Sequence, residues 1–113
     1  MLTINQLVKV YEEGINMHFK RNPSPDGLKG EYDPSSLEIL IYMPAIESKS
    51  DRDITVLHEF VHARDDVYFS KAHIKDMNKF EQKTKQEALK TYKKRPYILD
   101  FIMWLYKHSY CTL

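Results

Sequence analysis

The sequence predicts a single α+β domain that spans residues 1–113. Several segments carry apolar residues at helical spacing, one short segment is rich in Leu, Ile and Tyr as β-strands are, and clusters of Pro, Gly and Ser separate them. A chain of 113 residues can bury one modest core and little more. The expected architecture is therefore mostly helical, with one small antiparallel sheet.

The N-terminal part of the chain predicts a helix followed by two strands. Apolar residues recur on one helical face, which predicts a helix over residues 3–20, and a dense cluster of Asn, Pro, Ser and Gly ends it. Segments 29–32 and 37–43 are the predicted strands, joined by an Asp-Pro-Ser-Ser turn. Because Pro44 directly follows the second strand, we expect that strand at the edge of the sheet.

Three further helices complete the predicted fold. Their spacing places them over residues 54–68, 71–94 and 97–108, with Pro96 separating the last two. The last helix is apolar on nearly every side and therefore needs burial all round. Either it is the final helix of the core, or residues 96–113 form a segment through which copies of the chain associate.

The clearest functional signal is the stretch His58-Glu59-Phe60-Val61-His62 in the second predicted helix. Histidines at positions i and i+4 lie on one helical face, one turn apart, so both imidazoles can bind a single Zn²⁺ ion. Glu59 stands beside the first histidine and can take a proton from a water on the metal, which is the chemistry of H-E-x-x-H peptidases. The alternative is an ordinary amphipathic helix whose polar side carries these residues without a metal.

A catalytic zinc ion needs a third protein ligand and one open position. Glu87 is the first choice, because a turn and a second helix can bring it back to the metal and the small Ala that follows permits close helix packing. His73 and Glu81 are the alternatives, and a solvated position for Glu87 also stays open. His108 or Cys111 could fill the open position from the same or a neighbouring subunit, which would either block the metal in a latent enzyme or make the site structural.

With this motif, the strand before it and the glutamate helix after it, the chain resembles the gluzincin metallopeptidases, most of all the short, soluble archaeal minigluzincins. His58, Glu59 and His62 match the family's zinc motif. Glu87, in a Gln-Glu-Ala stretch, resembles the third ligand of related membrane peptidases, although the acidic residue usual soon after it is absent. The resemblance implies a minimal zincin-like fold, zinc-dependent cleavage of peptide bonds with narrow scope, and latency in which residues 96–113 or a partner chain block the cleft.

Composition narrows the expected partners and compartment. The formal net charge is +1, so nucleic acid is not an expected partner. No apolar run reaches the roughly 20 residues of a membrane span, the N-terminus lacks a signal-peptide layout, and the single cysteine cannot form an internal disulfide, so we expect a cytoplasmic protein. Expected partners are peptides or unfolded proteins as substrates, and further copies of the chain. The competing function is a non-catalytic, zinc-stabilised helical dimerisation module.

Overall fold

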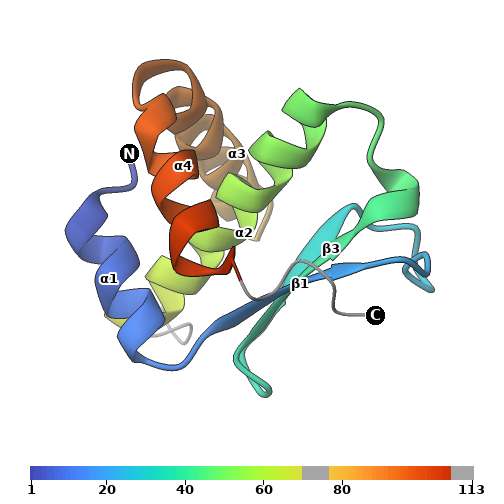
Figure 1. Cartoon of the computed structure of the whole chain (residues 1–113), viewed down its shortest axis with the longest axis horizontal. Coiled ribbons are helices and arrows are strands. Elements are labelled where there is room, and N and C mark those ends of the chain that lie inside the picture. The colour runs from blue at the N-terminus through green and yellow to red at the C-terminus, as the bar shows by residue number, and fades with distance from the viewer. Residues whose placement is uncertain (70–76, 108–113) are drawn as a thin grey trace.

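The structure, a computed structural model, describes residues 1–69 and 77–107. Within these residues the chain combines helices with one small sheet, which confirms the predicted α+β class (Figure 1). In chain order the elements are α1 Ile4–Glu12, β1 Asn16–Lys20, β2 Gly30–Asp33, β3 Glu38–Tyr42, the 3-10 helix η1 Met43–Ala45, α2 Lys49–Tyr68, α3 Met77–Lys94 and α4 Pro96–Leu105. None of the helices in the described residues is long and apolar enough to cross a membrane.

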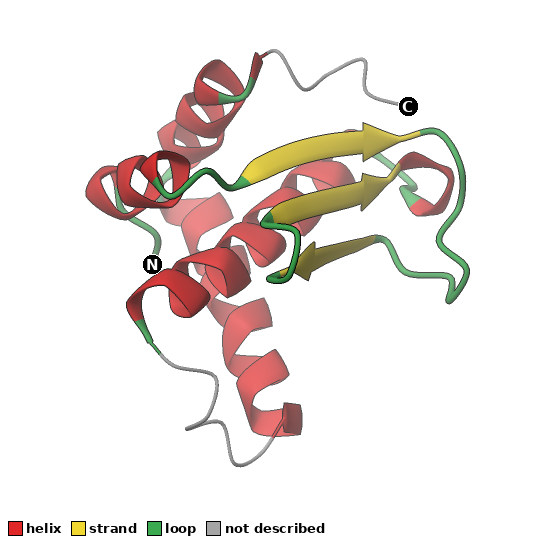
Figure 2. Cartoon of the chain, turned by 90° about the horizontal axis from the view of Figure 1, so that it is seen from below, coloured by secondary structure: helices red, strands yellow, loops and turns green. Residues whose placement is uncertain are grey.

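The sheet is mixed, with its strands in the order β1-β3-β2 (Figure 2). β1 runs parallel to β3 and β2 runs antiparallel to it, so the prediction of an antiparallel sheet is wrong for one of the two pairings. The edge position predicted for segment 37–43 is also wrong, because β3 has a neighbour on both sides and Pro44 lies in η1, beyond the strand. The edge strand that packs on helix α2 is β2.

The helix predicted over residues 3–20 ends at Glu12, and its second half forms strand β1. Gly14 follows with φ +87°, a backbone conformation that glycine adopts at no steric cost and that commonly ends a helix. Beyond it Ile15, Met17 and Phe19 are buried and alternate with less buried residues. This period of two is that of a half-buried strand.

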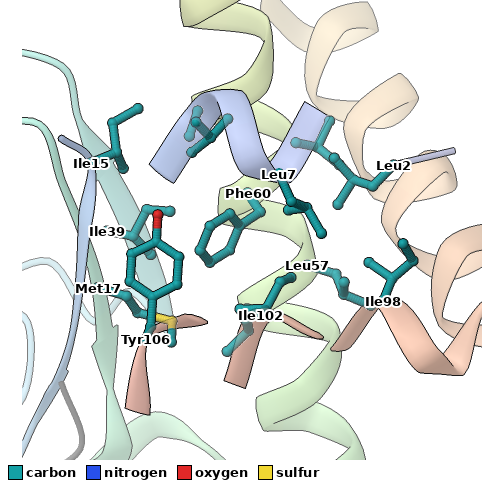
Figure 3. Close-up of a cluster of buried hydrophobic side chains, with 14 of the residues drawn as sticks. Leu2, Leu7, Ile15, Met17, Ile39, Leu57, Phe60, Ile98, Ile102 and Tyr106 are labelled. Atoms are coloured by element: carbon teal, nitrogen blue, oxygen red, sulfur yellow. The ribbon is translucent and has the colours of Figure 1, made fainter. Parts of the chain in front are cut away.

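The core lies between the sheet and the helices that gather on one side of it (Figures 1 and 3). It takes fully buried side chains from every layer, among them Ile39 of β3, Phe60 of α2 and Ile102 of α4. On the outer side of α4, by contrast, Tyr97 and Trp104 are 54% and 66% exposed. Helix α4 is therefore a core helix that also presents aromatic side chains to solvent.

Helix α2 runs through the middle of the molecule and contacts α1, α3, β2 and β3 (Figure 1). It begins earlier than predicted, at Lys49, because the Ser48 hydroxyl accepts a hydrogen bond from the backbone N–H of Asp51 and so caps the helix. Its buried residues point in most directions around the helix axis. Packing on so many sides makes α2 a rigid support for the polar residues of its motif.

Candidate metal centre

The motif predicted to bind a metal lies in the middle of α2. His58 and His62 are half-buried and their rings meet edge to face, with centroids 4.9 Å apart. Their Nε2 atoms are 3.2 Å apart, as expected for residues one turn apart on the same helical face. The structure therefore brings together the two histidines that the sequence pairs.

A carboxylate from helix α3 completes the group. Glu81 places one oxygen 2.9 Å from Nε2 of His62 and the other 3.1 Å from Nε2 of His58. Donor atoms bound to a tetrahedral zinc ion at 2.0–2.1 Å lie roughly 3.3 Å from one another. The observed triangle is within a few tenths of an ångström of that spacing, so His58, His62 and Glu81 fit a shared metal ion.

The packing of α3 explains why Glu81 faces the histidines. Glu81, Thr84 and Ala88 follow the i, i+3, i+7 spacing of one helical side, and Thr84 and Ala88 are buried where α3 lies against α2. Phe80, the residue before Glu81, lies beside His62, with their ring centroids 5.4 Å apart. Thr84 and Ala88 thus hold α3 close enough for a carboxylate to reach across.

The structure does not place Glu87, the first choice for the third ligand, in the histidine group. Its carboxylate accepts hydrogen bonds from both terminal nitrogens of Arg64, with Nη2 at 2.8 Å from Oε1, and it does not belong to the histidine group. Burial alone would raise the pKa of Glu87, but the hydrogen bonds and charge of Arg64 outweigh that effect and lower it. Glu87 lies roughly 9 Å beyond Glu81 along the axis of α3, which takes it past the histidines.

Three other candidate ligands from the sequence cannot be placed. His73, His108 and Cys111 lie outside the described residues. Their proposed roles, as the alternative third ligand or as groups that close the open position, stay predictions.

Glu59 lines the same cleft as the histidines and is only 6% exposed. Burial, followed by the negative charges of Glu81 and Glu31, raises its pKa to about 8. A carboxyl group with a raised pKa holds a proton that it can deliver to a leaving group, which suits the acid half of a general acid–base role. This position beside the ligand group agrees with the role that the sequence predicts for Glu59.

The ionisation of His58 also suits metal binding. Burial and the neighbouring charge of His62 lower the pKa of His58, although Glu81 works in the opposite direction. A lower pKa favours the neutral imidazole at neutral pH, which is the form that binds metals.

Strand β2 approaches the motif closely at Gly30, a residue that the sequence analysis did not single out. A Cβ atom at this position would stand 2.8 Å from the Thr55 methyl group and 3.2 Å from both Cγ of Glu59 and the backbone oxygen of Leu40. Real Cβ atoms essentially never come within 3.0 Å, so only glycine lets the edge strand lie this close. A glycine inside a predicted strand is the sequence signal that could have indicated a close approach.

The cleft around these residues has a volume of about 1260 Å³ and is bordered by β2, α2 and α3. At the wall formed by β2, the Tyr32 hydroxyl donates a 2.7 Å hydrogen bond to Asp66 of α2. Leu28, Tyr68 and Phe69 also line the cleft, although they are large apolar side chains and substantially exposed. The cleft therefore combines a polar centre with an apolar rim.

Comparisons of the chain with protein-family models, curated proteins and solved structures gave no match. The interpretation of this centre accordingly depends on its own geometry and electrostatics.

Proposed function

We propose that the chain is a zinc-dependent endopeptidase with a minimal, zincin-like arrangement of its active site. The observation that carries the proposal is the group of His58, His62 and Glu81, whose donor atoms lie 2.9–3.2 Å apart in a cleft that Glu59 also lines. Three donors from side chains leave a fourth position for water or substrate, as in catalytic zinc sites. Among the described residues the metal group consists of these three side chains.

The chemistry follows from where the side chains lie. A zinc ion in such a site polarises a carbonyl group and lowers the pKa of water toward about 7. Glu59 accepts the proton of the attacking water and later delivers it to the nitrogen of the departing amine. The oxygen of the water forms a bond to the carbonyl carbon, and the C–N bond breaks.

The walls of the cleft favour a peptide as the substrate. β2 is an edge strand, so an extended peptide could pair with its backbone and pass the metal group. The volume of about 1260 Å³ exceeds what a small metabolite needs. Exposed side chains such as Phe69 supply apolar surface for the side chains of a flexible or unfolded protein segment.

The decisive experiment measures metal content and peptide cleavage on one preparation, across a protein dilution series, with and without a chelator. We expect one zinc ion per chain and cleavage that the chelator abolishes and added zinc restores. Glu59→Gln should keep the zinc ion and lose cleavage, because the amide cannot accept the proton. Full activity of zinc-loaded Glu59→Gln, or activity that survives complete removal of the metal, contradicts the proposal.

Self-association and latency belong to the same proposal. Tyr97 and Trp104 are exposed on the outer side of α4, and the ring centroids of Phe101 and Trp104 lie 6.0 Å apart. Helix α4 therefore packs in the core on one side and presents an aromatic surface on the other. Such a surface is suited to contact with a second copy of the chain. We propose that association through this surface restrains the peptidase, so that activity per chain increases on dilution.

A further inference from the structure

Lys85 of α3 lies one helical turn after Glu81 and lines the same cleft. Residues at i and i+4 project from the same side of a helix, so Lys85 projects from the same side of α3 as Glu81, whose carboxylate approaches the histidines. Its side chain is exposed rather than packed. The ammonium is therefore on the metal-facing side of α3 and accessible to a substrate.

Lys85 has no counter-ion among the residues that the structure describes. Other lysines of the chain do, for example Lys29, whose Nζ lies 3.0 Å from Asp51. An unpaired cation at this place can take an anionic group of a ligand as its partner.

Two of the phenol groups near the cleft, those of Tyr32 and Tyr42, are already engaged. The hydroxyl of Tyr32 donates to Asp66, and the hydroxyl of Tyr42 donates to Glu31. Each phenol would have to leave a carboxylate before it could donate to a substrate. Lys85, whose three N–H donors have no carboxylate partner in the described part of the chain, needs no such exchange.

We propose that Lys85 is the electrophilic residue of the site, which stabilises the negative charge that develops on the carbonyl oxygen of the scissile peptide bond. The inference rests on the proposed peptidase function. Glu59 approaches from α2, next to β2, and Lys85 approaches from α3, so the base and the cation reach a substrate carbonyl from different walls of the cleft. Donors aimed at developing charge in a partly desolvated cleft supply a large part of catalysis.

Lys85 acts in the step in which water adds to the carbonyl group. Water forms a C–O bond to the carbonyl carbon while the π electrons of the carbonyl move to its oxygen, and Glu59 takes the proton. Lys85 neutralises the resulting oxyanion without giving up a proton. The carbonyl re-forms as the C–N bond breaks, and the proton on Glu59 passes to the amine nitrogen.

The test compares three zinc-loaded variants with the unaltered chain: Lys85→Met, Lys85→Arg and the matched control Lys83→Met. Lys83 lines the same cleft and is also exposed, but at two residues from Glu81 it projects from another side of α3. For Lys85→Met we expect an unchanged zinc content, a kcat lower by about 100-fold and little change in KM. Lys85→Arg should recover part of the kcat, and Lys83→Met should stay within about twofold of the unaltered chain.

A second readout does not depend on turnover. Binding of an anionic phosphinic pseudopeptide, whose tetrahedral oxygens carry the charge that Lys85 is expected to meet, should weaken at least tenfold in Lys85→Met and not in Lys83→Met. Equal effects of the two methionine variants, or a loss confined to KM, overturn the inference. If the unaltered chain binds the phosphinic peptide in a Lys85-dependent way but cleaves nothing, the peptidase proposal fails. The role of Lys85 in binding an anionic group in the cleft then still holds. If it binds none, both fail.

Discussion

Exchanging the carboxylates of Glu81 and Glu87 for amides, one at a time, separates metal binding from helix packing. Glu81→Gln keeps the shape of the side chain but removes the negative charge that both histidines contact, at 2.9 Å and 3.1 Å. A two-histidine site remains, and amides bind zinc poorly, so we expect the affinity for zinc to fall by at least about 100-fold. Since each factor of ten corresponds to about 1.4 kcal/mol, zinc should then stabilise the fold by about 2.7 kcal/mol less at a given saturating concentration.

Glu87→Gln is the matched control, and its expected effect is the reverse. Glu87 pairs with Arg64, and both side chains are largely buried, at 15% and 10% exposed. Removing the charge leaves Arg64 with Asp65 as its remaining carboxylate partner, so the metal-free protein should lose about 3 kcal/mol of stability. Its affinity for zinc should change only a few-fold, because the triangle of donor atoms stays in place.

The assay has two parts. Zinc affinity is measured on metal-free protein by competition with a chromophoric chelator, and the free energy of unfolding is measured in urea with and without zinc. Glu81→Gln should differ from the unaltered chain only when zinc is present, since its partly exposed carboxylate contributes less than about 1 kcal/mol to the metal-free fold. Loss of zinc by Glu87→Gln, with Glu81→Gln unaffected, would refute the reasoning and restore Glu87 as the ligand.

Gly30→Ala should lower the free energy of unfolding by about 1–3 kcal/mol in urea and reduce cleavage in a peptidase assay. Adding Thr55→Ser, which removes the methyl group 2.8 Å from the new Cβ, should recover part of both losses. Without metal, Glu59→Gln should become more stable relative to the unaltered chain as the pH rises from about 4.5 to about 8. The reason is that folded Glu59, with its raised pKa, keeps a proton that the unfolded chain releases. A difference in the free energy of unfolding, measured in urea, that stays constant with pH contradicts this. Trp104→Ser should shift sedimentation toward the monomer and remove the dependence of activity per chain on dilution; an unchanged sedimentation profile rules out α4 as the contact.

The sequence predicted the parts of the site that depend on local spacing. Two histidines four residues apart must share a helical face, and the structure places His58 and His62 accordingly. The choice between Glu81 and Glu87 was not local, because Thr84, Ala88 and Thr91 are buried on the same side of α3 and the pattern admits both carboxylates. The missing signal was Arg64, since a buried guanidinium requires a carboxylate partner and Glu87 supplies it.

The sheet was harder to predict for a different reason. Ile15 continues the helical spacing of the apolar residues before it, which predicts a helix that runs on. Ile15, Met17 and Phe19 nevertheless already follow the period of two of a strand. Only Gly14 marks the change, and one glycine near a predicted helix end is weak evidence. The parallel pairing of β1 with β3 depends on how distant segments meet in the core, which no local pattern contains.

The charges around the motif argue for a bound cation independently of the motif itself. Glu59 and Glu81 line the cleft beside two imidazoles, and burial, followed by the charges of Glu81 and Glu31, raises the pKa of Glu59. Without a cation, a pKa of about 8 leaves Glu59 mostly protonated at neutral pH, and a protonated carboxyl cannot act as a base. A divalent ion held by His58, His62 and Glu81 would offset the neighbouring negative charge and lower the pKa of Glu59. In the proposed peptidase, occupancy of the metal site would therefore also favour the ionised form of Glu59 that its role as a base requires.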